Sequence, residues 1–134
     1  MTDRVLTGGC LCGQVRYEAR GPAVNVRACH CRICQKVTGA PFYSRAVFPA
    51  DAVTRTGETR SVAVPDRPRR LACAACGSPM FVQPRDHAPF LAISLASLDD
   101  PDALVPDMHI WTSSKVAWLR LDDGLPQHLE GAPE

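Results

Sequence analysis

Short apolar runs separated by turn-forming residues make up most of the chain. Residues 5–7 and 15–19 flank Gly8, Gly9 and Gly13, a pattern that predicts a hairpin. Further strands are predicted at residues 24–31, 42–48, 61–64, 70–73, 80–83 and 90–95. Twelve prolines and nine glycines interrupt every longer segment, so short helices are predicted only at residues 32–38 and 99–104. The pattern therefore predicts a mainly β fold.

The length, charge and hydropathy of the chain narrow the class of protein. Its 134 residues contain no repeat, low-complexity stretch or linker, so residues 1–134 are expected to form a single domain. Lys and Arg total 15 against 14 Asp and Glu, and the resulting net charge of +1 argues against nucleic acid as a partner. No apolar run approaches the roughly 20 residues that span a bilayer, so no membrane association is expected.

The cysteines carry most of the chemical information in this sequence. Seven of them fall into three groups: Cys10 and Cys12, then Cys29, Cys31 and Cys34, then Cys73 and Cys76 followed by Gly77. An odd count leaves one thiol outside any disulfide framework, and the N-terminal residues lack the basic and apolar regions of a secretion signal. We therefore expect a protein of the reducing cytoplasm whose clustered thiols bind metal.

The spacing of the cysteines predicts which of them share an ion. In extended chain the two cysteines of a C-x-C pair point to the same side, while a C-x-x-C turn brings two sulfurs back together. Cys29, Cys31 and Cys34 can then converge on one ion, and the two remaining pairs complete a tetrahedron of Cys10, Cys12, Cys73 and Cys76. This arrangement predicts two zinc ions per chain, a closed structural one and one whose three protein ligands leave a position for water or substrate.

A protein side chain in that fourth position would make the second site purely structural. The candidates are His30, His87, His109, His128 or a nearby carboxylate. His30 lies between two of the cysteines and is expected to point away from their metal, whereas His109 is the most credible ligand of the four. An iron–sulfur centre is a further alternative, although the cysteine pattern matches no common cluster motif.

Other residues give weaker predictions. Three polar residues follow the triple closely enough to contact a substrate or simply to be exposed on a short helix: Gln35, Lys36 and Thr38. Three arginines could form a solvated loop or bind an acidic substrate: Arg67, Arg69 and Arg70. The aromatic residues Phe42, Tyr43 and Phe48 could line a pocket or the core, and Trp111 and Trp118 are expected to pack the C-terminal segment against the sheet.

Several of these motifs resemble the glutathione-dependent formaldehyde-activating enzyme family, which also includes centromere protein V. The similar stretches are Gly9-Cys10-Leu11-Cys12-Gly13, Cys29-His30-Cys31-Arg32-Ile33-Cys34-Gln35-Lys36, Gly39-Ala40-Pro41-Phe42 and Cys73-Ala74-Ala75-Cys76-Gly77. A C-terminal segment with His109-Ile110-Trp111, Lys115, Trp118 and Asp123-Gly124-Leu125-Pro126 is similar as well. The resemblance spans roughly residues 4–130.

The resemblance implies a fold, two zinc sites and a reaction. It implies a β-tent, a structural zinc on Cys10, Cys12, Cys73 and Cys76, and a catalytic zinc on Cys29, Cys31 and Cys34. The family's namesake activity is a carbon–sulfur lyase activity that joins glutathione to formaldehyde and gives S-hydroxymethylglutathione. Two function classes follow, namely a zinc enzyme acting on a small thiol or thiol–aldehyde adduct, and a non-catalytic zinc module that binds a partner.

Overall fold

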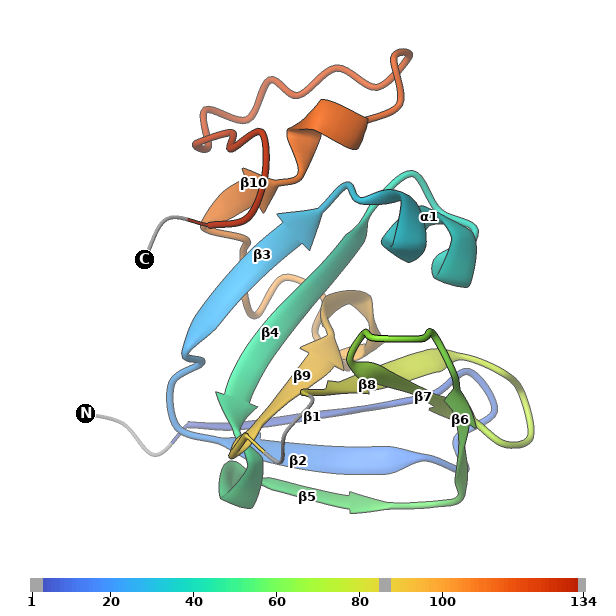
Figure 1. Ribbon diagram of the computed structural model, residues 1–134. Helices are drawn as coiled ribbons and strands as arrows, with labels where there is room; N and C mark the ends of the chain where they lie inside the picture. Colours follow the sequence, from blue (N-terminus) through green and yellow to red (C-terminus); the bar gives the residue numbers. More distant parts are fainter. Residues whose placement is uncertain (1–3, 85–87, 133–134) are drawn as a thin grey trace.

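Two β-sheets share one hydrophobic core in the computed structural model, which describes residues 4–84 and 88–132 (Figure 1). The smaller sheet has the order β1–β2–β5, formed by β1 (Val5–Gly9), β2 (Arg16–Arg20) and β5 (Val53–Thr56). The larger sheet has the order β10–β3–β4–β9–β8–β7–β6. Its strands are β3 (Asn25–Cys29), β4 (Tyr43–Pro49), β6 (Thr59–Val62), β7 (Arg69–Cys73), β8 (Pro79–Gln83), β9 (Phe90–Ser94) and β10 (Met108–Ile110).

The connections between the strands are short. The helix α1 (Arg32–Thr38) links β3 to β4, and three 3-10 turns cover Ala50–Ala52, Leu95–Ser97 and Thr112–Ser114. Neighbouring strands are antiparallel except β10, which pairs in parallel with β3. In Figure 1 the smaller sheet lies at the base, and β3 and β4 rise from it toward α1, β10 and the C-terminal segment.

The prediction of a mainly β fold is confirmed. The eight predicted strands are present with ends shifted by no more than two residues, and the predicted helix at residues 32–38 is α1. The predicted helix at residues 99–104 is wrong, because these residues form bends and a turn. Asp100 explains the difference: its carbonyl accepts the N–H of Ala103 at 3.1 Å and its carboxylate accepts the N–H of Asp102 at 3.0 Å, so local bonds replace a helix.

The main core lies between the two sheets and follows the alternation of the strands. In β2, Tyr17 and Ala19 are buried while the residues on either side of each are exposed, as expected for a strand with one face on the core. The Tyr17 ring meets Phe81 of β8 edge to face, with ring centroids 5.7 Å apart. A Cβ on Gly8 would overlap the Tyr17 hydroxyl, so only glycine allows β1 to approach this ring.

A second, smaller cluster lies at the other end of β3 and β4. It contains Cys29, Cys34, Tyr43 and Ile110, with Met108 among the partly buried residues packed against it. Because β10 contributes Ile110, the C-terminal part of the chain covers the region where β3 passes into α1. Among the described residues, no helix is long and apolar enough to cross a membrane.

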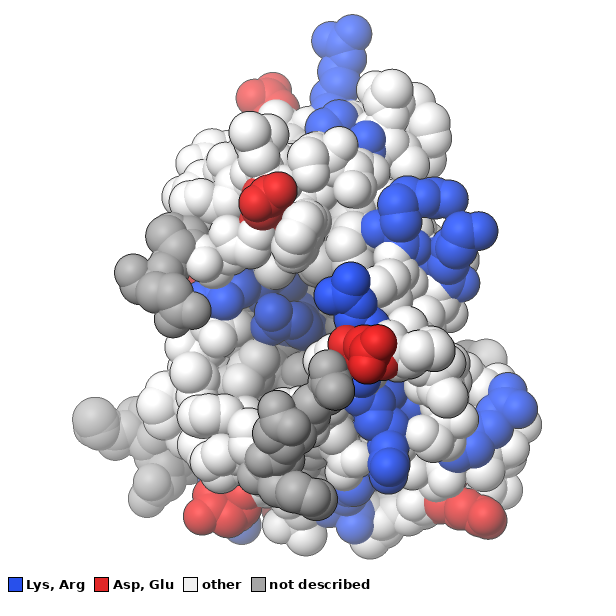
Figure 2. Space-filling view, in the orientation of Figure 1, with Lys and Arg blue, Asp and Glu red and all other residues white. Residues whose placement is uncertain are grey.

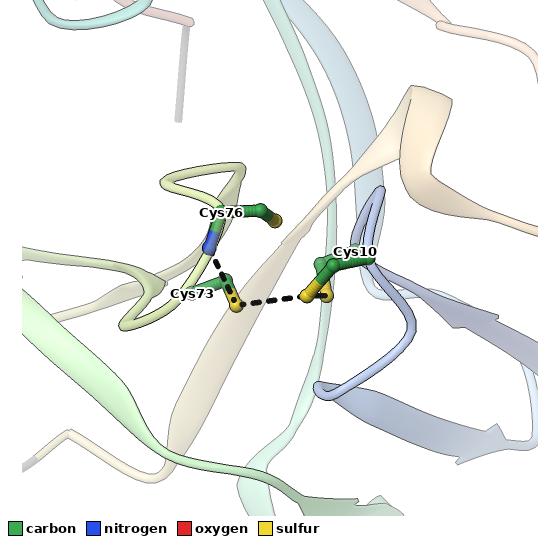
Figure 3. Close-up of side chains that lie close together, drawn as sticks. Cys10, Cys73 and Cys76 are labelled. Atoms are coloured by element: carbon green, nitrogen blue, oxygen red, sulfur yellow. Dashed lines mark hydrogen bonds between the residues drawn. The ribbon is translucent and has the colours of Figure 1, made fainter.

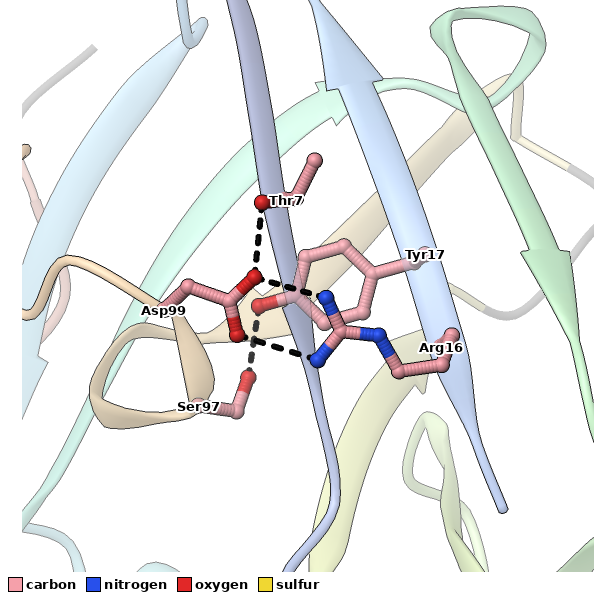
Figure 4. Close-up of polar contacts among 5 residues, drawn as sticks. All are labelled: Thr7, Arg16, Tyr17, Ser97 and Asp99. Atoms are coloured by element: carbon pink, nitrogen blue, oxygen red, sulfur yellow. Dashed lines mark hydrogen bonds and ion pairs between the residues drawn. The ribbon is translucent and has the colours of Figure 1, made fainter. Parts of the chain in front are cut away.

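A polar network fastens the smaller sheet to the segment after β9 (Figure 4). Asp99 accepts two hydrogen bonds from Arg16, at 3.0 and 2.6 Å, and a third from the Thr7 hydroxyl at 2.7 Å. Beside it, the Tyr17 and Ser97 hydroxyls are hydrogen-bonded at 2.7 Å. The hydrogen bonds from Arg16 and then from Thr7 lower the pKa of Asp99 to about 2.

We expect Asp99→Asn to lower the urea concentration at the midpoint of unfolding at neutral pH. In acid the difference from the wild type should disappear. The folded-state pKa of Asp99 is below its unfolded value, so the stabilisation is complete above about pH 4 and disappears as the pH falls toward 2. The measurement is urea unfolding of both proteins in the same metal state across this range, with Asp122→Asn as the control at another exposed carboxylate. A difference between wild type and Asp99→Asn that does not shrink in acid would contradict the assignment.

Candidate metal centres

Four cysteines from two hairpins form the first cluster. Cys10 and Cys12 lie at the tip of the β1–β2 hairpin, Cys73 ends β7, and Cys76 lies in the turn to β8, with all four sulfur atoms within 4.8 Å of one another. The expectation that Cys10 and Cys12 share an extended strand is wrong. They lie in a turn closed by a 3.2 Å hydrogen bond from the Gly13 N–H to the Cys10 carbonyl, and this turn aims both sulfurs the same way.

The spacing of the sulfur atoms fits a tetrahedral metal ion. Cys12 Sγ lies 3.6 Å from Cys10 Sγ and 3.8 Å from Cys73 Sγ. A tetrahedron with zinc–sulfur bonds of about 2.3 Å has sulfur–sulfur edges of about 3.8 Å. Figure 3 shows Cys10 and the two cysteines of the β7–β8 turn pointing into the same space. The cluster could therefore hold one metal ion.

Backbone N–H groups also point at these sulfurs. The N–H of Val15 donates to Cys10 Sγ at 3.3 Å, and those of Ala75 and Cys76 donate to Cys73 Sγ at 3.4 Å. Gly77 closes the second turn with φ +80°, in the left-handed region that glycine adopts without strain. Such donors stabilise thiolate charge, so the local chain is arranged for deprotonated cysteines.

Ser78 connects the two hairpins beside this cluster. Its hydroxyl lies 3.2 Å from Cys76 Sγ and also accepts the N–H of Leu11, from the opposite hairpin, at 3.2 Å. The hydrogen bond from Ser78 lowers the pKa of Cys76 to about 5. Sequence reasoning missed this residue, because its position after a C-x-x-C-Gly turn has no distinctive signature.

Three cysteines form the second cluster where β3 meets α1. Cys29 ends β3, Cys31 is the N-cap of α1, and Cys34 lies in the first turn, with the three sulfurs within 4.8 Å of one another. The N–H of Cys34 donates to Cys31 Sγ at 3.2 Å. The hydrogen bonds from Cys29 and then from Cys34 lower the pKa of Cys31, so Cys31 is the cysteine of this cluster that loses its proton most readily. Cys31 has the extended backbone angles that were predicted, with φ −66° and ψ 155°, and its sulfur also caps α1.

An arginine contacts this cluster from β7. Arg70 Nη2 donates to Cys34 Sγ at 3.2 Å, and its guanidinium carbon lies 5.4 Å from the centre of the Tyr43 ring. The positive charge offsets part of the negative charge that three thiolates would carry. Of the three arginines in the predicted cluster, the structure brings Arg67 and Arg70 to this site, whereas Arg69 is exposed and does not line it.

A cavity of about 210 Å³ opens beside the three cysteines. Its lining includes all three cysteines together with Arg45, Arg67, Arg70, Ile110 and Trp111. Figure 2 shows basic side chains in the hollow over β3 and β4, below the C-terminal segment. Sequence reasoning missed Arg45 and Trp111 as cavity residues, because their positions depend on the pairing of β3 with β4 and β10.

Three of the four histidines proposed as a fourth ligand are described, and they lie outside the three-cysteine cluster. His109 uses both ring nitrogens, with Nδ1 2.8 Å from His30 Nε2 and Nε2 2.7 Å from Asp123 Oδ2. His30 is fully buried, and burial, followed by the neighbouring His109, lowers its pKa to about 4. Within residues 4–84 and 88–132, the second group of potential metal ligands consists of cysteines only. His128 is half-buried and bonds to His109 through its backbone N–H, and His87 lies outside the described residues.

A comparison of the sequence with models of known protein families identifies the family of this chain. The model of the glutathione-dependent formaldehyde-activating enzyme family matches residues 5–114, which include all seven cysteines. The chain belongs to this family. A crystal structure of a Rhodobacter sphaeroides protein from structural genomics is similar in fold, with a TM-score of 0.58 and 21% identity, covering 75% of this chain and 97% of that one.

Of the three polar residues predicted after the triple, two make structural hydrogen bonds and one is exposed. Gln35 is buried and donates to the carbonyls of His30 at 2.8 Å and Ser114 at 2.9 Å, so it joins the metal turn to the C-terminal segment. Thr38 donates to the Cys34 carbonyl at 2.7 Å, and Lys36 is exposed.

The aromatic residues considered in the sequence lie in three kinds of surroundings: the core, the cavity wall and the exposed surface. Phe48 is fully buried in the core, Tyr43 lines the cavity beside the three cysteines, and Phe42 packs on the His30 ring with centroids 5.0 Å apart. The expectation that Trp118 packs against the sheet is wrong, because 72% of it is exposed, whereas Trp111 is 37% exposed.

We expect the two clusters to respond differently to loss of a cysteine. Cys73→Ser should yield unfolded or aggregated protein, because structural zinc contributes about 10 to 16 kcal/mol, as much as a domain's whole stability. Cys34→Ser should remain folded and lose one metal ion. The two residues form a matched pair, since Cys73 is 0% and Cys34 3% exposed.

Zinc content and thermal melting of the purified variants test this contrast. A soluble Cys73→Ser protein that melts at the wild-type temperature would show that the four-cysteine cluster does not hold the fold. A Cys34→Ser protein that retains the full metal content would refute the assignment of the second site.

Proposed function

We propose that this protein is a zinc-dependent enzyme of the carbon–sulfur lyase type that joins a small thiol to an aldehyde. Glutathione and formaldehyde, giving S-hydroxymethylglutathione, are the substrates that membership of the family favours. The observation that carries the proposal is the cluster of Cys29, Cys31 and Cys34 beside a cavity, with no histidine or carboxylate among the described residues grouped with it. Zinc held there would have a coordination position for a substrate thiol and would favour its thiolate form.

The chain's own residues would hold the ion and orient the substrate. Cys31, whose pKa is lowered by its two neighbouring cysteines, would supply ligands together with them, and Arg70 would limit the negative charge at Cys34. In the reaction the substrate sulfur attacks the aldehyde carbon, the carbon–sulfur bond forms and the carbonyl π bond breaks. The carbonyl oxygen takes up a proton and the thiol loses one, so the addition is balanced without an oxidant or reductant.

The basic side chains around the cavity support an acidic thiol as substrate. Arg45, Arg67 and Arg70 all line it, and guanidinium groups bind carboxylates through paired hydrogen bonds. Arg45 also lies directly opposite Arg27 in the β3–β4 pairing, an arrangement of like charges that an anion nearby would relieve. Glutathione, which carries two carboxylates, has the matching charge.

The other parts of the proposal follow from the first cluster and from thiol chemistry. Cys10, Cys12, Cys73 and Cys76 would hold a structural zinc, which gives two ions per chain and a single zinc-binding domain over residues 1–134. Thiolate ligands and a thiol substrate both require reducing conditions, so the cytoplasm is the proposed location.

We expect glutathione to perturb the second metal site directly. In the cobalt-substituted protein, glutathione should change the visible absorption of the wild type and leave that of Cys34→Ser unchanged, because only the three-cysteine site has a position for a further ligand. With formaldehyde added, S-hydroxymethylglutathione measured by NMR should form faster than without protein. If glutathione left the visible absorption of the cobalt-substituted wild type unchanged, the result would argue for another substrate or for the non-catalytic zinc module.

We also expect the cavity arginines to select acidic thiols. Arg67→Gln should weaken binding of glutathione by about tenfold, the loss of one partly exposed charge-assisted hydrogen bond, and should leave binding of the amine-bearing thiol cysteamine nearly unchanged. Arg69→Gln is the matched control, an exposed arginine two residues away that does not line the cavity. Equal effects of the two substitutions on glutathione would contradict a specific carboxylate contact.

A further inference from the structure

Trp111 forms part of the wall of the three-cysteine cavity. It follows β10 directly, and the preceding residue, Ile110, packs in the same buried cluster as Cys29 and Cys34. Trp111 itself lines the cavity and remains 37% exposed. A large aromatic ring is thus partly accessible beside the proposed open metal site.

The backbone of Trp111 is held in an unusual conformation. Its φ of 57° and ψ of 37° lie in the left-handed region, which is unfavourable for a bulky residue and persists only where surrounding bonds enforce it. Those bonds are present: the N–H of Trp111 donates to the Glu130 carbonyl at 2.9 Å, and its carbonyl accepts the N–H of Ser114 at 3.1 Å. Strained residues maintained in this way occur preferentially at ligand sites.

Two further bonds fix Trp111 relative to the cysteines. The N–H of His30 donates to the Ile110 carbonyl at 3.0 Å, and Gln35 donates to the Ser114 carbonyl at 2.9 Å. His30 and Gln35 each directly follow a cysteine of the cluster in sequence. The backbone on either side of Trp111 is therefore attached to the same turn that positions the sulfurs.

We propose that Trp111 is a substrate-contacting residue that packs against the organic part of a bound thiol, beyond its sulfur. The cavity supplies arginine side chains for the charged groups of the substrate and the Trp111 ring as an apolar surface for its carbon chain. Trp118 provides the contrast within the same chain, since it is 72% exposed and does not line the cavity. The inference rests on the proposed function, because it assumes that a thiol enters the second metal site.

Two thiols of different size test this role in the cobalt-loaded protein. Glutathione is a tripeptide that extends well beyond its sulfur, whereas 2-mercaptoethanol extends only two carbons from it. Trp111→Ala should weaken glutathione binding by about tenfold and leave 2-mercaptoethanol binding within about twofold, with cobalt absorption as the readout. Trp118→Ala should bind both thiols as the wild type does.

Fluorescence gives a second readout that does not depend on the alanine variant folding. Trp118→Phe leaves Trp111 as the sole tryptophan of the chain, and its emission should change with glutathione over the same concentration range as the cobalt absorption. A wild-type cobalt response with unchanged Trp111 emission would overturn the inference and leave the proposed function intact. If a folded Trp111→Ala protein bound glutathione and 2-mercaptoethanol more weakly by the same factor, the inference would also be overturned. If neither thiol perturbs the cobalt spectrum of the wild type, the proposed function fails and the role of Trp111 fails with it.

Discussion

The convergence of four sulfur atoms from two distant hairpins is the constraint on which the rest of the structure depends. Cys12 and Cys73 are 61 positions apart in sequence and their sulfurs are 3.8 Å apart. One hairpin belongs to the smaller sheet and the other to the larger, so this cluster joins the two sheets at their turns. Four thiolates at this distance would repel one another strongly, and a cation bound between them would turn that repulsion into a cross-link whose free energy is comparable to the stability of a whole domain.

The second cluster depends on a different set of contacts. Its three sulfurs come from one short stretch of chain, so their convergence requires only the β3–α1 turn and the cap that Cys31 provides. What the rest of the fold contributes is the surroundings: Arg70 from β7 supplies charge, and the segment after β10 supplies the cavity wall. The distinction explains why one cluster can serve the fold while the other faces a cavity.

The sequence was most informative where the relevant geometry is local. The helix at residues 32–38 and the alternation in β2 follow from neighbouring residues alone. The strand β5 escaped prediction because its sequence, Val-Thr-Arg-Thr, carries no apolar alternation. Arg70 and Trp111 could not be placed at the cysteines in advance, because their positions depend on pairings between strands far apart in the chain.

The family match ends inside the segment that supports the cavity wall. The match covers residues 5–114 and so includes both clusters, Arg70 and Trp111. The groups that hold the cavity wall lie partly beyond it: the Glu130 carbonyl binds the N–H of Trp111, and the Asp123 carboxylate binds His109. A change in residues 115–132 would therefore move the wall while leaving the sulfur ligands in place. The sulfur ligands and the cavity wall are thus held by different parts of the chain.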